Sequence, residues 1–430
     1  MPTLLQIVHG YPPREIAGTE IYAERLTRAF SRRGWTVHVL ASTRAPGHTQ
    51  GAWLPVEQDG AGGTIHRIVN NLPWRPLGQC ERDPGLRRSC NLLIAELEPD
   101  IIHIQHLLFL DVQLDLRAPT VFHLHDAWAW CPRGGSLLEQ GKKPCSGPES
   151  SKCIACYGDF ARGSAVEHQL GRLASRLSAW VDTDRLHRSW KRLPPRLRGI
   201  TRVGPKPAAS QTDFLNRQEA LKTALNDADL VVSPSAFLGR EAERHGIQKV
   251  TVLPHGADLT PTTRSPRSFL FLGSLAFHKG PDLVAEAWQL ARAHDPELPP
   301  LRIIGPEVEG ECVRSLPSAM LEPAVPSTMV PELLATAHAL VLGSRWPENA
   351  PLVIHEARAA GCPTIAPAIG GIPEFVEPHR DGRLYEAGSA EALAKVLLDW
   401  RAFATYPVHP PPSFQNHVDA LETHYQRLIG

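Results

Sequence analysis

Residues 268–294 read SFLFLGSLAFHKGPDLVAEAWQLARAH and indicate the fold of the second half of the chain. Ser268–Gly273 is an apolar run with the length of a buried strand. Pro281–His294 has the pattern of an amphipathic helix, and proline favours a first helical turn. Leu301–Gly305 is a second apolar run. Together the three segments predict a β-α-β unit with parallel strands.

The same alternation of apolar runs and amphipathic stretches fills the rest of the chain. The other expected strands are Leu4–His9, Thr36–Ala41, Thr64–Val69, Ile101–Gln105, Thr120–His125, Ala339–Gly343 and Thr364–Ala366. The other expected helices are Gly18–Arg33, Leu86–Leu97, Val330–Ala337, Leu352–Ala360 and Phe414–Leu428. Nearly continuous aliphatic strands are typical of a parallel sheet covered on both faces. We therefore expect an α/β protein with two doubly wound, Rossmann-like units and a ligand crevice at the carboxyl ends of their strands.

A chain of 430 residues is too long for one ordinary core and suggests two domains. We expect the first domain in residues 1–232 and the second in residues 233–412, with the boundary near Ser233–Phe237. The last helix, in residues 413–430, is expected to pack back onto the first domain. Residues from about 131 to 207 interrupt the alternation, and we interpret them as an insertion in the first domain.

Composition argues against some classes of function. Lys and Arg number 45, and Asp and Glu also number 45, so the formal net charge of zero gives no support to a nucleic-acid partner. No apolar stretch reaches the roughly 18 residues of a membrane span. The N-terminus lacks the pattern of a signal peptide. We therefore expect a cytoplasmic protein.

The segment WPENAPLVIHEA, Trp346–Ala357, places two carboxylates on one loop and helix. Glu348 precedes the helix that Pro351 opens, and Glu356 follows a little over two helical turns later. Two carboxylates on one rim can each bind a vicinal diol, and free amides at a helix start suit hydroxyl or phosphate oxygens. On spacing alone, a plain helix-face acid at Glu356 and a partner of the helix dipole at Glu348 explain the pattern equally well.

Lys279 and Gly280 stand at the entrance of the helix that begins at Pro281. A lysine beside free backbone amides suits a diphosphate. A single Lys-Gly pair is a weak signal, but it gains weight from the pair Glu348 and Glu356 later in the chain.

Seven short motifs follow one another along the chain. They are Ala17–Glu20, Asp100–His106, Val121–Asp126, Leu253–Asp258, Lys279–Gly280, Glu348–Glu356 and Gly370–Glu374. In their order and spacing the chain resembles the family 4 retaining glycosyltransferases of GT-B fold, over nearly its whole length. The resemblance implies two domains facing each other across a cleft, the first on the acceptor side and the second binding a nucleotide sugar such as a UDP- or GDP-sugar. It also points to a subgroup with a Cys-containing insertion.

The resemblance further implies roles for individual residues. Lys279 would hold the donor diphosphate, Glu348 the hydroxyls of the transferred sugar, and Glu356 the ribose diol. Gly18 would let the first loop approach the phosphates, and His125 would lie near the reacting centre. The implied catalytic residues are His125, Glu348 and Lys279. The implied donor set is Gly18, Ser274, Lys279, Arg345, Glu348, Asn349, Ala350, Pro351, Leu352 and Glu356, with Glu20 and Asp126 on the acceptor side.

Ser274 departs from the family pattern, which usually has an arginine at this position. The second cation for the diphosphate is then absent, or it is supplied by Arg345 or by the insertion. The details of diphosphate binding are open at this point, whereas the place of the site is not.

The reaction that the resemblance implies is sugar transfer to an acceptor hydroxyl with retention of anomeric configuration. The leaving diphosphate helps to deprotonate the acceptor, and the transfer needs no metal. Such chemistry relies on positioning and on stabilising the leaving group. The expected product is a glycan, a polysaccharide or a glycoconjugate. The alternatives are a nucleotide-sugar epimerase and a non-catalytic regulator that binds a sugar nucleotide or a metal.

Four of the eight cysteines cluster at Cys131, Cys145, Cys153 and Cys156, among residues that favour tight turns. Four thiolates, two of them in a Cys-x-x-Cys pair, suit a structural zinc ion or an iron–sulfur cluster. Reduced thiols or a local disulfide are the other interpretations. A bound metal would fold the insertion, which has few apolar residues for a core.

The insertion is also strongly basic, since Arg162–Lys206 holds 11 Lys or Arg against 3 acids. One interpretation is a solvated charged face. The other is a docking surface for an anionic acceptor or a membrane, because Leu170, Leu173, Leu177 and Trp180 recur at helical spacing.

Four histidines, His103, His106, His123 and His125, lie on two of the expected strands or directly after one. Because their positions alternate on buried strands, we expect most of them to be structural and not to bind a metal. Only His125 is assigned a functional role.

Overall fold

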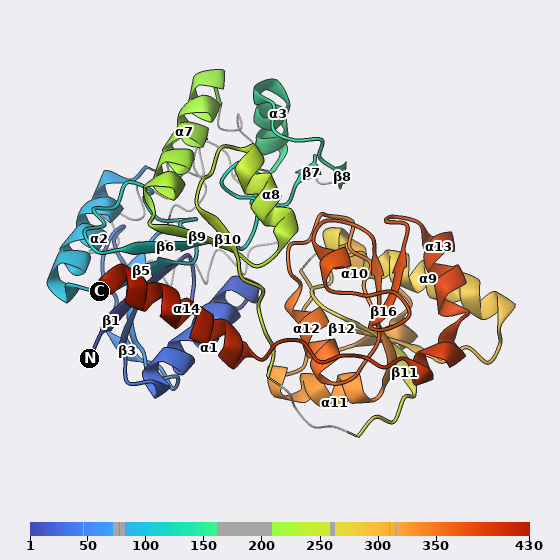
Figure 1. Cartoon of the computed structure of the whole chain (residues 1–430). Coiled ribbons are helices and arrows are strands. Elements are labelled where there is room, and N and C mark those ends of the chain that lie inside the picture. The colour runs from blue at the N-terminus through green and yellow to red at the C-terminus, as the bar shows by residue number, and fades with distance from the viewer. Residues whose placement is uncertain are drawn as a thin grey trace.

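The protein, described here from a computed structural model, has two lobes, each built around one sheet (Figure 1). The structure describes residues 1–45, 47–71, 77, 82–140, 142–160, 209–258, 263–308, 310–314 and 316–430. The basic stretch Arg162–Lys206, with its expected docking surface, lies outside these residues. Among the described helices, none combines the length and the apolar character needed to cross a membrane.

Eight strands form the sheet of the first domain, in the order β10-β9-β6-β5-β1-β2-β4-β3. They are β1 (Thr3–Val8), β2 (Thr36–Thr43), β3 (Glu57–Gln58), β4 (Thr64–Val69), β5 (Ile101–Ile104), β6 (Thr120–His123), β9 (Leu230–Ser233) and β10 (Val250–Val252). Only β3 runs antiparallel to its neighbour. Leu4 pairs with Val37 on one side and Ile101 on the other, so aliphatic runs fill the centre of the sheet.

Several helices of this domain begin at capping residues that are recognisable in the sequence. The helices are α1 (Gly18–Arg32), α2 (Pro84–Leu97), α3 (Ser150–Phe160), α7 (Gln211–Asp227) and α8 (Ala236–Arg244). Asp83 caps α2 ahead of a proline, and Ser210 with Asp213 forms a capping box on α7. The described part of the insertion is a hairpin, β7 (Leu138–Glu139) and β8 (Lys143–Pro144), followed by α3.

Six parallel strands form the second sheet, in the order β13-β12-β11-β14-β15-β16. They are β11 (Ser268–Leu272), β12 (Leu301–Ile304), β13 (Leu321–Glu322), β14 (Ala337–Val341), β15 (Thr364–Pro367) and β16 (Gly382–Tyr385). The accompanying helices are α9 (Pro281–His294), α10 (Gly310–Arg314), α11 (Val330–Ala335), α12 (Leu352–Ala359) and α13 (Ala390–Leu397). The expected β-α-β unit is thus β11-α9-β12, and the two doubly wound domains are confirmed.

The boundary between the two sheets differs from the expected one. Val250 of β10 pairs with Val231 of β9, so the first sheet extends to Val252, and the second begins at Ser268. The expected boundary at residue 233 therefore falls one helix and one strand too early. The sequence pattern missed β10 because three partly exposed residues make no apolar run.

The last helix, α14 (Phe414–Ile429), crosses back onto the first domain as expected (Figure 1). Leu421 and Tyr425 are fully buried there, and the Tyr425 ring stacks on Phe30 of α1 at 5.1 Å. Glu422 accepts a hydrogen bond from Trp35 Nε1 at 2.8 Å. The last helix of the chain, α14, therefore packs against the first helix, α1.

The packing of α14 predicts a large effect of truncating its core residue. Leu421→Ala leaves a cavity between α14 and the first sheet, and it should lower the free energy of unfolding by about 2–5 kcal/mol. Urea denaturation measures this change. Leu290→Ala on α9 is the matched control, since Leu290 is 39% exposed, and it should change stability by less than about 0.5 kcal/mol. Equal effects of the two changes would contradict this packing.

Candidate active site

The strand order of the second sheet reverses between β11 and β14. From β11 the sheet grows through β12 to β13, and from β14 it grows the other way to β15 and β16. In open α/β sheets, ligands bind in the crevice that such a reversal opens at the carboxyl ends of the strands. Lys279 follows β11 and Glu348 follows β14, so both residues belong to the loops that flank this crevice.

Two glycines bring these loops into backbone contact. Gly280 has a φ of 66°, and a Cβ added to it would lie 2.0 Å from the carbonyl oxygen of Gly343. A Cβ on Gly343 would lie 2.2 Å from the Gly280 oxygen. Because a side chain at either position would push the loops apart, glycine at both allows the Lys279 loop to reach Glu348.

Lys279 and Glu348 form an ion pair in the crevice. The ammonium donates to both carboxylate oxygens at 2.9 Å, and Ser344 Oγ donates to Glu348 Oε1 at 2.5 Å. Burial raises the pKa of Glu348, but the charge of Lys279 and these hydrogen bonds outweigh burial and hold the pKa below its usual value. Glu348 is therefore an ionised carboxylate, 6% exposed, whose charge Lys279 balances.

Arg345 lies beside this loop, but its guanidinium is already engaged. It donates to the two carboxylate oxygens of Asp282 at 2.7 and 2.8 Å. Ser274, at the position of the usual arginine, lies partly exposed in the loop after β11. Arg345 can therefore replace the missing arginine at a diphosphate only by leaving Asp282.

The loop after β14 reaches across to the first domain. Asn349 Nδ2 donates to the backbone oxygen of His125 at 3.1 Å, and Asn349 Oδ1 accepts from Ser235 Oγ at 2.5 Å. The loop ends with Ala350 and Pro351, and α12 begins behind them without a side-chain cap. The first amides of α12 are therefore available to a ligand beside the ion pair.

Glu356 lies on α12 and also meets the first domain. Arg25 of α1 donates to Glu356 Oε1 at 3.2 Å. Burial raises the pKa of Glu356, and Arg25 opposes this shift. The carboxylate expected to bind a ribose diol thus has a cationic partner that sequence reasoning did not identify.

Gly18 begins α1, whose first turn also lacks a side-chain cap. A Cβ added to Gly18 would meet no described atom within 4 Å. Packing among the described residues therefore does not require glycine at this position. The space beside the free amides of α1 is open to a ligand.

A chain of amide side chains holds the partly exposed His125. His125 Nε2 donates to Gln105 Oε1 at 2.9 Å, Gln105 Nε2 donates to Gln6 Oε1 at 3.0 Å, and Gln6 Nε2 donates to Thr27 Oγ1 at 2.7 Å. Burial lowers the pKa of His125 to about 3. The ring is therefore neutral, with its proton on Nε2 and a bare Nδ1. Sequence reasoning gave Gln6 and Gln105 no role.

Three more histidines form a directed chain of hydrogen bonds behind the end of β6. His417 Nδ1 lies 3.0 Å from the Pro254 oxygen, and a carbonyl can only accept, so Nδ1 carries the proton. His417 Nε2 therefore accepts from the Tyr22 hydroxyl at 2.7 Å. The Tyr22 oxygen then accepts from His123 Nδ1 at 3.3 Å, and His123 Nε2 accepts from His255 Nε2 at 3.1 Å.

This chain requires neutral imidazoles. Burial lowers the pKa of His417 to about 4 and those of His123 and His255 well below 6.5. Within the described ranges, His123, His125 and His255 make up the one group of three side chains whose possible metal-ligand atoms lie within 4.8 Å of one another. Both nitrogens of His123 are already hydrogen-bonded, so a structural role accounts for its position.

Glu20 and Asp126, assigned to the acceptor side, each lie beside a histidine. Glu20 Oε1 is 3.0 Å from His9 Nε2, and Asp126 Oδ2 is 3.4 Å from His106 Nε2. Sequence reasoning assigned His9 no role and expected His106 to be structural.

The four clustered cysteines lie around the hairpin and α3. Cys131 precedes the hairpin, Cys145 follows it, and Cys153 and Cys156 lie on α3. Burial raises the pKa of Cys131 to about 11 and raises that of Cys153, and nearby Cys145 adds to both shifts. All four are free thiols, and no three of their sulfur atoms lie within 4.8 Å of one another. The expected metal therefore stays a prediction.

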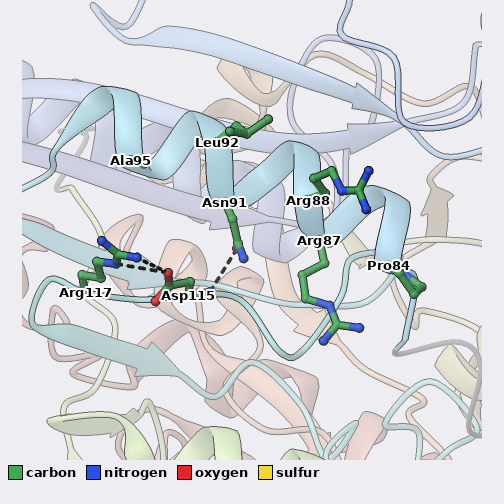
Figure 2. A pocket seen from close by; sticks show the side chains of 8 residues that line it. All are labelled: Pro84, Arg87, Arg88, Asn91, Leu92, Ala95, Asp115 and Arg117. Atoms are coloured by element: carbon green, nitrogen blue, oxygen red, sulfur yellow. Dashed lines mark hydrogen bonds and ion pairs between the residues drawn. The ribbon is translucent and has the colours of Figure 1, made fainter.

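A separate shallow pocket of about 430 Å³ lies along α2 in the first domain (Figure 2). Its lining residues are Pro84, Arg87, Arg88, Asn91, Leu92, Ala95, Asp115 and Arg117. Within it, Arg117 pairs with Asp115 at 2.9 Å on the exposed surface. None of the expected site residues lines this pocket, so we assign it no part in the candidate active site.

The buried histidines predict that acid destabilises the protein. An unfolded imidazole binds its proton near about pH 6.5, whereas His417 resists protonation down to about pH 4 when folded. The unfolded chain therefore binds more protons in this interval, so stability is complete above about pH 6.5 and falls as the pH is lowered. The loss should be on the order of 1–2 kcal/mol per such histidine by pH 5. Thermal unfolding midpoints between pH 7 and 5 measure it.

His417→Gln should flatten this pH dependence, because the variant lacks the group that resists protonation. His294→Gln is the control, since His294 is exposed on α9, and it should leave the dependence unchanged. A His417→Gln variant with the wild-type slope would contradict the assignment.

Comparison with known proteins matches both halves of the chain to glycosyltransferases. Residues 16–150 match the family model "Glycosyltransferase Family 4", and residues 261–401 match "Glycosyl transferases group 1". The D-inositol 3-phosphate glycosyltransferase of Streptomyces coelicolor is 31% identical over 147 residues, which cover 30% of this chain and 32% of the relative. The corresponding protein of Streptomyces scabiei is 28% identical over 168 residues, covering 35% and 37%. The chain thus spans about a third of the length of the curated relatives it matches.

Solved structures resemble the chain over its whole length. Sucrose-phosphate synthase of Thermosynechococcus elongatus superposes with a TM-score of 0.59 at 16% identity, covering 100% of this chain and 97% of that one. Anabaena HepE in complex with UDP superposes with a TM-score of 0.55 at 16% identity and the same coverage. At this identity the likeness concerns the fold. The chain therefore has the GT-B fold, and its two halves are similar to the Glycosyltransferase Family 4 and the Glycosyl transferases group 1 models.

Proposed function

We propose that the protein transfers a sugar from a nucleoside-diphosphate sugar to an acceptor hydroxyl, with retention of the anomeric configuration. The observation that carries the proposal is the Lys279–Glu348 ion pair at the strand reversal of the second sheet. It combines a cation suited to a diphosphate with a carboxylate suited to sugar hydroxyls. Both residues lie beside the uncapped start of α12.

In this proposal the donor separates Lys279 from Glu348 and binds both residues. Lys279 turns from Glu348 to the diphosphate, and the released carboxylate accepts hydrogen bonds from the sugar. Glu356 binds the ribose diol, and the free amides of α1 at Gly18 face the phosphates. Similar structures contain UDP or UDP-glucose, which makes a UDP-sugar the first donor to test and a GDP-sugar the second.

The proposed chemistry exchanges one bond at the anomeric carbon. The bond from that carbon to the diphosphate oxygen breaks, and a bond to the acceptor oxygen forms on the same face. The acceptor proton passes to the departing phosphate oxygen, whose charge Lys279 stabilises. Neutral His125, with its bare Nδ1, can accept a hydrogen bond from the sugar or the acceptor and so orient it. No protein nucleophile or metal takes part.

Removing the charge of Glu348 tests the proposal. Glu348→Gln keeps the shape of the side chain but loses the ionised acceptor for sugar hydroxyls, so kcat should fall by roughly 100-fold or more. Transfer assays with UDP- and GDP-sugars measure this. Glu377→Gln, which changes an exposed carboxylate paired with Arg380, is the control and should keep the wild-type rate. A Glu348→Gln enzyme that keeps its rate would contradict the site assignment. The Gln variant is preferable to Lys279→Ala, because that change leaves the buried Glu348 carboxylate without its counter-ion and can unfold the domain.

The same assays separate the alternative functions. An epimerised nucleotide sugar in the absence of an acceptor would favour an epimerase. Nucleotide-sugar binding without turnover over many acceptors would favour a regulator. A cytoplasmic location, with membrane contact through the basic stretch Arg162–Lys206, remains part of the proposal and rests on the sequence alone.

The four-cysteine cluster carries a separate part of the proposal, a structural zinc ion or iron–sulfur cluster that folds the hairpin and α3. It rests on four free thiols around one hairpin and one helix, with Cys145 near both Cys131 and Cys153. Metal analysis of freshly purified protein should find about one equivalent of zinc or of a cluster, lost in Cys153→Ser. Cys362→Ser, which changes a buried cysteine of the second domain, should keep it. Less than about half an equivalent in the wild type would overturn this part.

A further inference from the structure

The sheet of the first domain has its own reversal of strand order, between β1 and β5. From β1 the sheet grows through β2 to β4, whereas β5 continues the other way to β6, β9 and β10. His9 directly follows β1, and His106 follows β5, so one imidazole stands on each side of the crevice expected at this point. The two ring centroids are 4.7 Å apart, edge to face.

A carboxylate lies behind each of these rings. Glu20 Oε1 accepts from His9 Nε2 at 3.0 Å. Leu108 N donates to His106 Nδ1 at 2.9 Å, so Nδ1 is bare, and the proton on Nε2 faces Asp126 Oδ2 at 3.4 Å. The crevice between β1 and β5 is thus flanked by two acids, and His106 is neutral.

Both carboxylates of this crevice are ionised. Burial raises the pKa of Glu20 and of Asp126. At Glu20 the hydrogen bond and charge of His9 outweigh burial, and at Asp126 the charge and hydrogen bond of His106 with the Trp128 amide do so, and both pKa values lie below their usual range. Burial lowers the pKa of His106, in agreement with its bare Nδ1. At neutral pH Glu20 and Asp126 are therefore both ionised, and they lie beside a neutral His106.

Two buried atoms of the crevice lack a hydrogen-bond partner among the residues that the structure describes. They are Glu20 Oε2 and His9 Nδ1. Glu20 is only 4% exposed, and a buried carboxylate oxygen without a partner is unfavourable. A hydroxyl or ammonium group of a ligand would satisfy it, whereas a phosphate oxygen would not.

The crevice lies next to the donor loop of the second domain. Asn349 donates to the backbone oxygen of His125, and Asp126 is the next residue along the chain. The Asp126 side chain is 28% exposed. On its other side Gly135 packs so closely that a Cβ there would lie 2.4 Å from Asp126 Oδ1. A molecule bound beside Asp126 therefore lies close to the sugar that Glu348 would hold.

We propose that the crevice between β1 and β5 binds the acceptor through hydroxyl or amino groups, and that it discriminates against acceptors with a phosphate or carboxylate at this end. Ionised Glu20 and Asp126 accept hydrogen bonds from such donors. An anionic group offers only acceptors and meets like charge at short range, where repulsion is strong. The inference rests on the proposed function, because an acceptor exists only if the protein transfers a sugar.

Matched pairs of acceptors test this inference. Breakdown of the donor is measured with myo-inositol against inositol 3-phosphate, and with glucosamine or glucose against glucose 6-phosphate. The unphosphorylated member of each pair should stimulate or inhibit donor breakdown at a concentration at least tenfold lower. Glu20→Gln should reduce this ratio by threefold or more. Glu24→Gln, which changes a carboxylate on the same helix paired with Arg28, is the control.

The outcomes separate this inference from the proposed function. No turnover of any nucleotide sugar, with or without acceptor, would overturn the proposed function. Turnover in which the phosphorylated members act at equal or lower concentrations would overturn the inference alone. Donor hydrolysis that no pair affects would also count against it. A purely structural role of Glu20 would change stability and leave the ratio as in the wild type.

Discussion

The candidate site of the second domain depends on the backbone contact between Gly280 and Gly343, where the strand order of the second sheet reverses. Because neither residue has a side chain, the loops after β11 and β14 touch, and Lys279 meets Glu348 although the two are far apart in the sequence. The ion pair keeps the buried carboxylate of Glu348 ionised. In the proposed function, a diphosphate takes the place of Glu348 at Lys279, and sugar hydroxyls take the place of Lys279 at Glu348.

The first sheet has a reversal of strand order of its own, between β1 and β5, and hydrogen bonds link the loop after β6 to the loop after β14. Asn349 bonds the end of β6 directly, and α14 anchors the end of the second domain on α1. The directed chain from Pro254 through His417 and Tyr22 to His255 ties the connecting segment to the same place. Hydrogen bonds that need neutral histidines thus hold the connecting segment and α14 on the first domain.

The sequence was sufficient for what is local in the chain. The apolar runs predict most strands, and Lys279 and Glu348 stand in short motifs whose loops the strand order brings together. It was insufficient for what depends on distant partners. No sequence motif marks Arg25, because its role depends on Glu356, which lies far away in the sequence and in the other domain. The sequence also did not predict the role of His417, because this residue acts through its hydrogen bond with Tyr22. It did not predict β10, because this strand pairs at a sheet edge and has no apolar run of its own.

The most direct test of the central claim is a crystal structure of the protein with a bound UDP- or GDP-sugar. The account predicts that the nucleotide occupies the crevice between β11 and β14. The Lys279 ammonium should lie on the diphosphate, and the Glu348 carboxylate should be separated from it and bonded to hydroxyls of the sugar. A nucleotide bound elsewhere, with the Lys279–Glu348 pair still intact, would contradict the account.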